Sequence, residues 1–199
     1  MAEILGIGCP HGPHMRFTDE TMANCYFRIN LRNAKTPAAL RDPENWPAKM
    51  RKEWGNDEGV SAARRHREEV INGFRAARQA LDQFNPDFVL MFGDDQYENF
   101  TEDIIPPFCV LAYDDLTSYP FKGRPTNVWG EPEDHPITMR SKPDIARWLA
   151  SRFLEEGVDM AYAYKPLHWE GLGHAFVNIQ MYLDYDRKGF DHQIGRAHV

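Results

Sequence analysis

Three short segments of the sequence contain polar side chains that could bind a metal or catalyse a reaction. Each lies at the end of an apolar run or next to glycine. His11 lies in a loop rich in proline and glycine, Gln96 directly follows two aspartates, and His174 directly follows a glycine. Histidines and carboxylates in such a set are typical of a metal site or of acid–base catalysis, because imidazole binds transition metals and titrates near neutral pH. A plainer interpretation also exists for each. A loop histidine is often structural, and the aspartates suit the cap of a following helix.

The segments between these residues alternate between strand-like and helix-like patterns. Four apolar runs predict strands at residues 4–8, 88–92, 108–113 and 158–164. Helical spacing of apolar residues predicts helices over 61–84 and 141–156, whereas 175–183 fits either structure and 114–140 indicates a long surface excursion. The alternation predicts an α/β fold: a single domain with a largely parallel central sheet flanked by helices. Because ligands bind beyond the carboxyl ends of parallel strands, His11 and Gln96 are expected at one edge of the sheet.

Composition narrows the classes of function. The chain has 199 residues, a hydrophobic content of 42% and a formal charge of −7, which together indicate one globular domain. Net acidity argues against nucleic acid as a partner, since phosphate contacts need a basic face. No apolar run approaches the roughly 20 residues that cross a membrane, and the first residues do not form a secretory signal. The three cysteines, Cys9, Cys25 and Cys109, are expected to be free thiols in a cytoplasmic protein.

Four motifs in a fixed order carry a family resemblance, and they occupy residues 6–13, 86–96, 104–108 and 173–174. Together they resemble the class III extradiol ring-cleavage dioxygenases, and within these the LigB-like catalytic (beta) subunits of protocatechuate 4,5-dioxygenase and their relatives. The resemblance extends over residues 4 to about 183. It implies Fe(2+)-dependent cleavage of a catechol-type aromatic ring by O₂, as used in the catabolism of aromatic compounds. It also implies one of two quaternary structures for the protein: a homo-oligomer, or a complex with a small second subunit.

The resemblance assigns roles to three positions. His11 falls on the first iron ligand and His174 on an acid–base catalyst outside the metal shell. Gln96 falls on the second histidine ligand, and a neutral amide oxygen is a weaker donor to Fe(II) than imidazole. The glutamate ligand of the family falls downstream of this chain. A non-catalytic or metal-altered protein that binds an aromatic ligand or a partner subunit is therefore the alternative hypothesis, and a metal-dependent hydrolase is a third.

The last six residues, 194–199, read IGRAHV. One reading frame of a common short-read sequencing adapter encodes these residues before a stop codon. We therefore interpret 1–193 as the N-terminal part of a LigB-like domain and 194–199 as a non-native tail, with a natural polar tail as the alternative. Resequencing of the locus decides between them. On this interpretation the 199-residue chain should not be an active dioxygenase by itself, because it lacks the carboxylate ligand.

Overall fold

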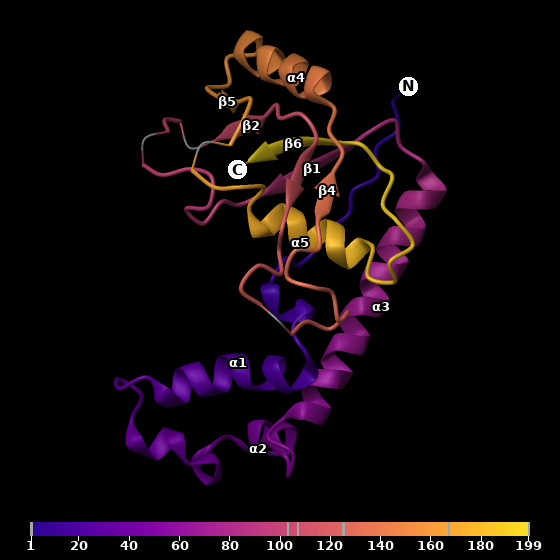
Figure 1. Ribbon diagram of the computed structural model, residues 1–199. Coiled ribbons are helices and arrows are strands. Elements are labelled where there is room, and N and C mark those ends of the chain that lie inside the picture. Colours follow the sequence, from indigo (N-terminus) through magenta and orange to yellow (C-terminus); the bar gives the residue numbers. More distant parts are fainter. Residues whose placement is uncertain (1, 103, 107, 125, 167, 199) are drawn as a thin grey trace.

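The computed structural model describes residues 2–198 apart from 103, 107, 125 and 167, and describes only the backbone of 25–30, 32 and 195–198. Within this part the fold is mixed α/β (Figure 1). The helices are α1 (Asp19–Arg32), α2 (Ala48–Trp54), α3 (Val60–Phe84), α4 (Pro143–Glu155) and α5 (His174–Leu183), with short 3-10 turns η1 (Pro13–Arg16), η2 (Ala38–Arg41) and η3 (Pro43–Asn45). The strands are β1 (Val89–Gly93), β2 (Cys109–Leu111), β3 (Leu116–Ser118), β4 (Ile137–Met139), β5 (Ala161–Ala163) and β6 (Ile194–His198).

Four strands form the central sheet in the order β1-β6-β2-β5. The pairs β1–β6 and β2–β5 are parallel, whereas β2 and β6 run antiparallel. The expected α/β class is therefore confirmed, and the sheet mixes both strand directions. Strands β3 and β4 form a separate antiparallel pair inside the segment 114–140, which was expected to be a long surface excursion. None of the helices in the described part is long and apolar enough to cross a membrane.

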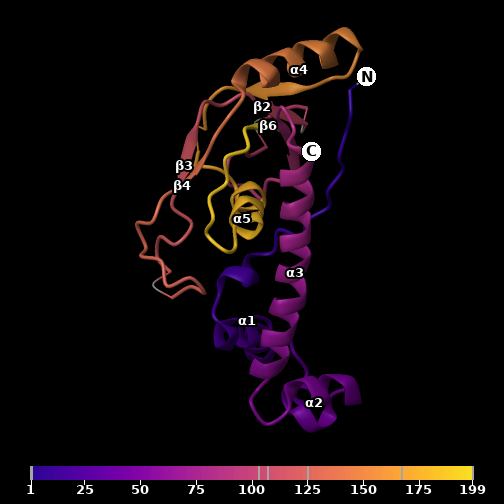
Figure 2. The ribbon, with the colours of Figure 1, turned by 90° about the vertical axis from the view of Figure 1, so that its right-hand side faces the viewer.

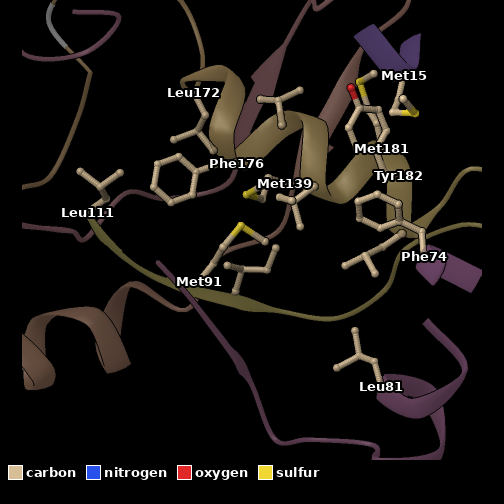
Figure 3. Close-up of a cluster of buried hydrophobic side chains, with 14 of the residues drawn as sticks. Met15, Phe74, Leu81, Met91, Leu111, Met139, Leu172, Phe176, Met181 and Tyr182 are labelled. Carbon is tan, nitrogen blue, oxygen red and sulfur yellow. The ribbon is translucent and has the colours of Figure 1, made fainter. Parts of the chain in front are cut away.

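Helices cover the sheet on both faces, with α4 on one face and α5 on the other (Figure 1). Side chains along β2 and just beyond it point alternately to the two faces of the sheet, which explains this arrangement. Val110 and Ala112 pack in a small cluster with Ala146 and Ala150 of α4. The intervening side chains join the larger core, which also holds Phe176 of α5, Met91 of β1 and, beside Tyr182 of α5, Phe74 of α3 (Figure 3). A short strand that is buried on both faces thus fixes two helical layers.

The long helix α3 confirms the predicted helix, and it links the sheet to the helices of the N-terminal region (Figure 2). It begins at Val60, because the Ala63 amide donates to the Gly59 carbonyl at 2.9 Å, and the Asp57 carboxylate accepts from the Ser61 amide in the first turn. It ends where Asn85 takes a left-handed conformation with φ 48°. Its apolar face packs on α5, and its N-terminal end carries α1 and α2 (Figure 2).

The strand predicted at residues 4–8 is absent, and this prediction is wrong. The segment is exposed, with Ile4 at 91% exposure. Strand β6 occupies the position beside β1. Val89 and Gly93 of β1 pair with Ile194 and His198 of β6. Whether 194–199 is a non-native tail stays a prediction. The apolar run of β1 is not fully buried, since Phe92 is 60% exposed.

The remaining local predictions hold with small differences. The strands expected at 108–113 and 158–164 are present as the shorter β2 and β5, and 175–183 is helical in α5. Cys9 and Cys109 are free thiols, as expected, and the side chain of Cys25 lies outside the described residues. Burial raises the pKa of the Cys109 thiol to about 12, which makes this cysteine chemically inert in the folded protein.

Arg67 of α3 joins the helix to the chain that follows the His11 loop. Its buried guanidinium donates to the carbonyls of Met15 and Phe17 and to the Asp19 carboxylate, the last at 2.9 Å. Arg64 donates to the same carboxylate at 3.0 Å, but its side chain is 60% exposed. The two arginines therefore share one acceptor and differ in burial.

We expect Arg67→Met to lower the free energy of unfolding by about 3–5 kcal/mol, because it leaves the carbonyls of Met15 and Phe17 without their donor and Asp19 with Arg64 alone. The matched change Arg64→Met should cost less than about 1 kcal/mol, as is usual for exposed ion pairs. Urea denaturation of both variants measures the difference. Equal losses would show that Arg67 has no special structural role.

A second prediction concerns the exposed segment 4–8. Removal of residues 194–199 leaves β1 and β2 without the strand between them, and the apolar run at 4–8 has the composition to replace it. We expect amide hydrogen exchange at residues 4–8 to slow by at least about tenfold in the shortened chain, as amides enter a sheet. Unchanged exchange at these amides would contradict the replacement, and exchange within α3 serves as the internal control.

Candidate active site

Glu98 and His174 form the centre of the candidate site. The Glu98 carboxylate accepts a hydrogen bond from the His174 backbone amide, 3.0 Å from each of its oxygens, at the first residue of α5. Its Oε2 also lies 2.9 Å from Nδ1 of the His174 ring. A carboxylate is favourable at a helix N-terminus, where free amides carry partial positive charge. Glu98 therefore caps the helix and orients the imidazole at the same time.

Asp95 builds the turn that presents Glu98. Its Oδ1 accepts from the amides of Glu98 and Phe100 at 3.0 and 3.3 Å, and its Oδ2 accepts from the amide of Asn99 at 2.9 Å. An aspartate followed by several free amides favours this type of side-chain-capped turn. The helix-capping role considered for this residue is thus replaced by the capping of a turn, and both oxygens of Asp95 are engaged in it.

Helix α5 also holds the loop that carries His11. Asn178 Nδ2 donates to the His11 carbonyl at 2.8 Å, and the Tyr182 hydroxyl donates to the Gly12 carbonyl at 2.7 Å. The rings of His11 and His174 lie with centroids 5.2 Å apart at 64°. The two histidines that the sequence singled out are therefore neighbours, and α5 brings them together.

Gln96 reaches this group through Asp94. The Gln96 amide donates to Asp94 Oδ2 at 2.9 Å, while Asp94 Oδ1 lies 3.2 Å from His11 Nε2. The hydrogen bond from Gln96, together with the charge of His11, holds the pKa of Asp94 below its usual value. Asp94 thus links Gln96 to His11, and His11 in turn lies beside His174.

The donor set can be compared with the needs of a metal ion. Among the described residues no group of three or more His, Cys, Asp or Glu side chains is arranged to hold one. A pair is present: Asp94 Oδ1 is buried, accepts no hydrogen bond from the described part of the chain, and faces His11 Nε2. Two adjacent ligands with bonds of about 2.1 Å stand roughly 3 Å apart around an octahedral ion. The spacing of His11 and Asp94 fits two such ligands.

Two glycines near His174 are required by close approach. A Cβ on Gly173 would stand 2.8 Å from Glu98 Oε2, and a Cβ on Gly171 would stand 2.5 Å from Ser118 Oγ, with φ +96° at Gly171. These glycines therefore make room for Glu98 and for Ser118, the two side chains that pack against this part of the loop.

A cavity of about 610 Å³ opens beside this group, which is large enough for a small aromatic molecule. Glu98 and His174 line it together with Leu172, Val177 and Trp169. Sequence analysis did not single out Glu98 or the cavity. The acidic residue two positions after Gln96 was visible, but only the fold shows that it faces His174.

Comparisons with known proteins identify relatives of one kind. Over 98 residues the chain is 31% identical to 2,3-dihydroxyphenylpropionate/2,3-dihydroxicinnamic acid 1,2-dioxygenase 2 of Pseudomonas putida, covering 49% of this chain and 27% of that protein. Over 94 residues it is 30% identical to the 2,3-dihydroxyphenylpropionate/2,3-dihydroxicinnamic acid 1,2-dioxygenase of a Mycobacterium species, strain MCS, covering 47% and 26%. The similarity thus spans about a quarter of the length of these relatives. No family model matches the chain.

The names of these relatives define the position of ring cleavage. The substrates in these names carry hydroxyls on ring carbons 2 and 3, and the cleaved bond joins carbons 1 and 2. The cleaved bond therefore lies beside the diol and not within it. The resemblance to extradiol ring-cleavage dioxygenases is therefore confirmed.

The contact between Gly173 and Glu98 gives a test of this site. Gly173→Ala should displace Glu98 from the start of α5 and lower the free energy of unfolding by about 1–2 kcal/mol through lost hydrogen bonds. Gly73, in the middle of α3, has no atom within 4 Å of the position that a methyl group would take, so Gly73→Ala should instead stabilise by about 0.5–1 kcal/mol. Urea denaturation measures both, and a stabilised Gly173→Ala variant would refute the close contact.

Proposed function

We propose that this chain is part of a non-haem Fe(II)-dependent extradiol dioxygenase, which opens a catechol-type aromatic ring with O₂ in aromatic catabolism. The observation that carries the proposal is a histidine, His174, which is oriented by a carboxylate, stands next to His11 and lines a cavity. The dihydroxylated aromatic substrates in the names of the relatives support it.

His174 is suited to proton transfer because Glu98 sets its tautomer. An ionised carboxylate only accepts hydrogen bonds, so Nδ1 carries the proton that faces Glu98 Oε2. In the neutral ring Nε2 is then the basic nitrogen, and it is available to take a proton from a substrate hydroxyl in the cavity. Glu98 stabilises the imidazolium that results. This pairing gives His174 an acid–base role without making it a metal ligand.

His11 and Asp94 are the residues that would hold the iron. Bound Fe(II) would supply the redox chemistry that activates O₂ and would draw both substrates to one centre. Gln96, at the position of the second family ligand, donates to Asp94 and thereby keeps the carboxylate turned toward His11. We propose that Asp94 takes over part of the role that the substituted histidine has in the family, with the amide oxygen of Gln96 as a further candidate ligand.

Four finer features are part of the same proposal. With the segment 4–8 in the position now held by β6, the central sheet would be largely parallel. The free thiols of Cys9 and Cys109 support a cytoplasmic location. A homo-oligomer or a small second subunit is proposed from the family resemblance. The substrates are a catechol-type small molecule and O₂.

One observation favours a second candidate. Gln96 and the two-ligand group formed by His11 and Asp94 suit a family protein that binds an aromatic ligand or a partner subunit without iron chemistry. Anaerobic titration with Fe(II), followed by a catechol and O₂, separates the two functions. Metal uptake followed by a yellow ring-opened product supports the dioxygenase, and the absence of both supports the binding protein.

Two variants test the roles of the histidines in the protein expressed from its native gene. His174→Ala should retain iron and slow the chemical step by about 10²–10⁴-fold, the usual contribution of a positioned acid–base group. His11→Ala should lose iron first and activity as a consequence. Iron content, melting temperature and single-turnover rate are measured side by side. Turnover of His174→Ala at the parental rate would remove its assigned role.

A further inference from the structure

Arg16 is a buried cation in the wall of the cavity. It is 8% exposed, and its NH1 donates to the Pro120 carbonyl at 3.3 Å. Its Nε is fully buried and has no hydrogen-bond partner among the described residues. Buried arginines are normally paired with a carboxylate, because removing a charge from water is costly. No such ion pair is present for Arg16 within the described part of the protein.

A second guanidinium stands close to the first. Arg124 also lines the cavity, and both arginines approach the ring of Phe17, with centroid distances of 5.5 Å for Arg124 and 6.0 Å for Arg16. Burial, and then the charge of Arg124, hold the pKa of Arg16 below its usual value. Two like charges near one cavity wall repel each other, so an anion between them would be bound favourably.

The other charged groups around the cavity are already matched. Lys122 lies 3.5 Å from Glu170, and Glu98 is engaged with His174. Ion pairing among the described residues therefore leaves the cationic charge of Arg16 and Arg124 uncompensated. The same cavity also contains the exposed indole of Trp169 and the apolar side chains of Leu172 and Val177. Its lining thus combines an apolar surface for a ring with a cationic end.

We propose that Arg16 and Arg124 form a subsite for the carboxylate of an acidic aromatic substrate. The planar guanidinium groups match a carboxylate geometrically and can bind it through paired hydrogen bonds. The aromatic ring lies against the apolar lining and points toward His174. This inference rests on the proposed function in one respect only, since it makes the bound molecule a substrate. The anion subsite itself requires neither iron nor ring hydroxyls.

Calorimetric titration of the metal-free protein tests the subsite with a pair of isosteric ligands. 3-Phenylpropionate carries a carboxylate, and 3-phenylpropionamide has the same shape without the charge. We expect the acid to bind at least about tenfold more tightly than the amide, because only the acid can pair with the guanidinium groups. Arg124→Gln should weaken binding of the acid about tenfold and leave binding of the amide unchanged. Lys122→Gln is the matched control and should change either affinity less than about twofold, since its charge is exposed and paired.

Arg16→Gln should abolish the preference for the acid, and its circular dichroism shows whether it folds. If Arg16→Gln does not fold, binding by Arg124→Gln, a change at an exposed position, tests the proposal by itself. Equal affinity for acid and amide, no binding of either, or an unchanged preference in Arg124→Gln would overturn the proposal. Failure of the proposed function has a different signature, because acid binding would persist while no catechol is cleaved in the iron-loaded protein.

Discussion

The site depends on the burial of α5. Each residue from Ala175 to Leu183 is buried, so the polar side chains on this helix must find partners inside the protein. Asn178 and Tyr182 find them in the carbonyls of the His11 loop, and Gln180 finds one in the Thr138 carbonyl of β4. Three hydrogen bonds donated by buried side chains of the helix thereby fix the His11 loop and β4 against it. The loop of His11 needs no strand of its own to reach the site, because the helix determines its position.

The start of α5 imposes the second constraint. A helix that begins inside a protein leaves amides that need acceptors, and Glu98 supplies one from the turn that Asp95 organises. The same carboxylate then meets the ring of the first helical residue, His174. The orientation of the histidine thus follows from helix capping, and the absence of a side chain at Gly173 is what allows the contact.

Local patterns predicted the elements that local forces determine. The helical periodicity of α3 and the apolar runs of β1 and β2 were visible in the sequence, since each depends on residues near one another in the chain. The segment 4–8 was not predictable in the same way, because strand pairing is a competition between distant segments and β6 occupies the place beside β1. His11, Gln96 and His174 were found by residue type and motif. Glu98 and Arg16 were not, because an acidic or basic residue becomes informative only when its neighbours in space are known.

The charges around the cavity favour one orientation of an acidic substrate. The charge of Arg124 opposes the charged form of Arg16 and the charge of Glu98 favours it, so both groups act on this guanidinium. Glu98 is already engaged by His174 and cannot also neutralise both guanidiniums. An aromatic acid bound with its carboxylate at the arginines would turn the opposite part of its ring toward His174, which also lines the cavity. Reversal would place the carboxylate beside Glu98, where like charges repel. The same arrangement that binds an anion therefore also orients it.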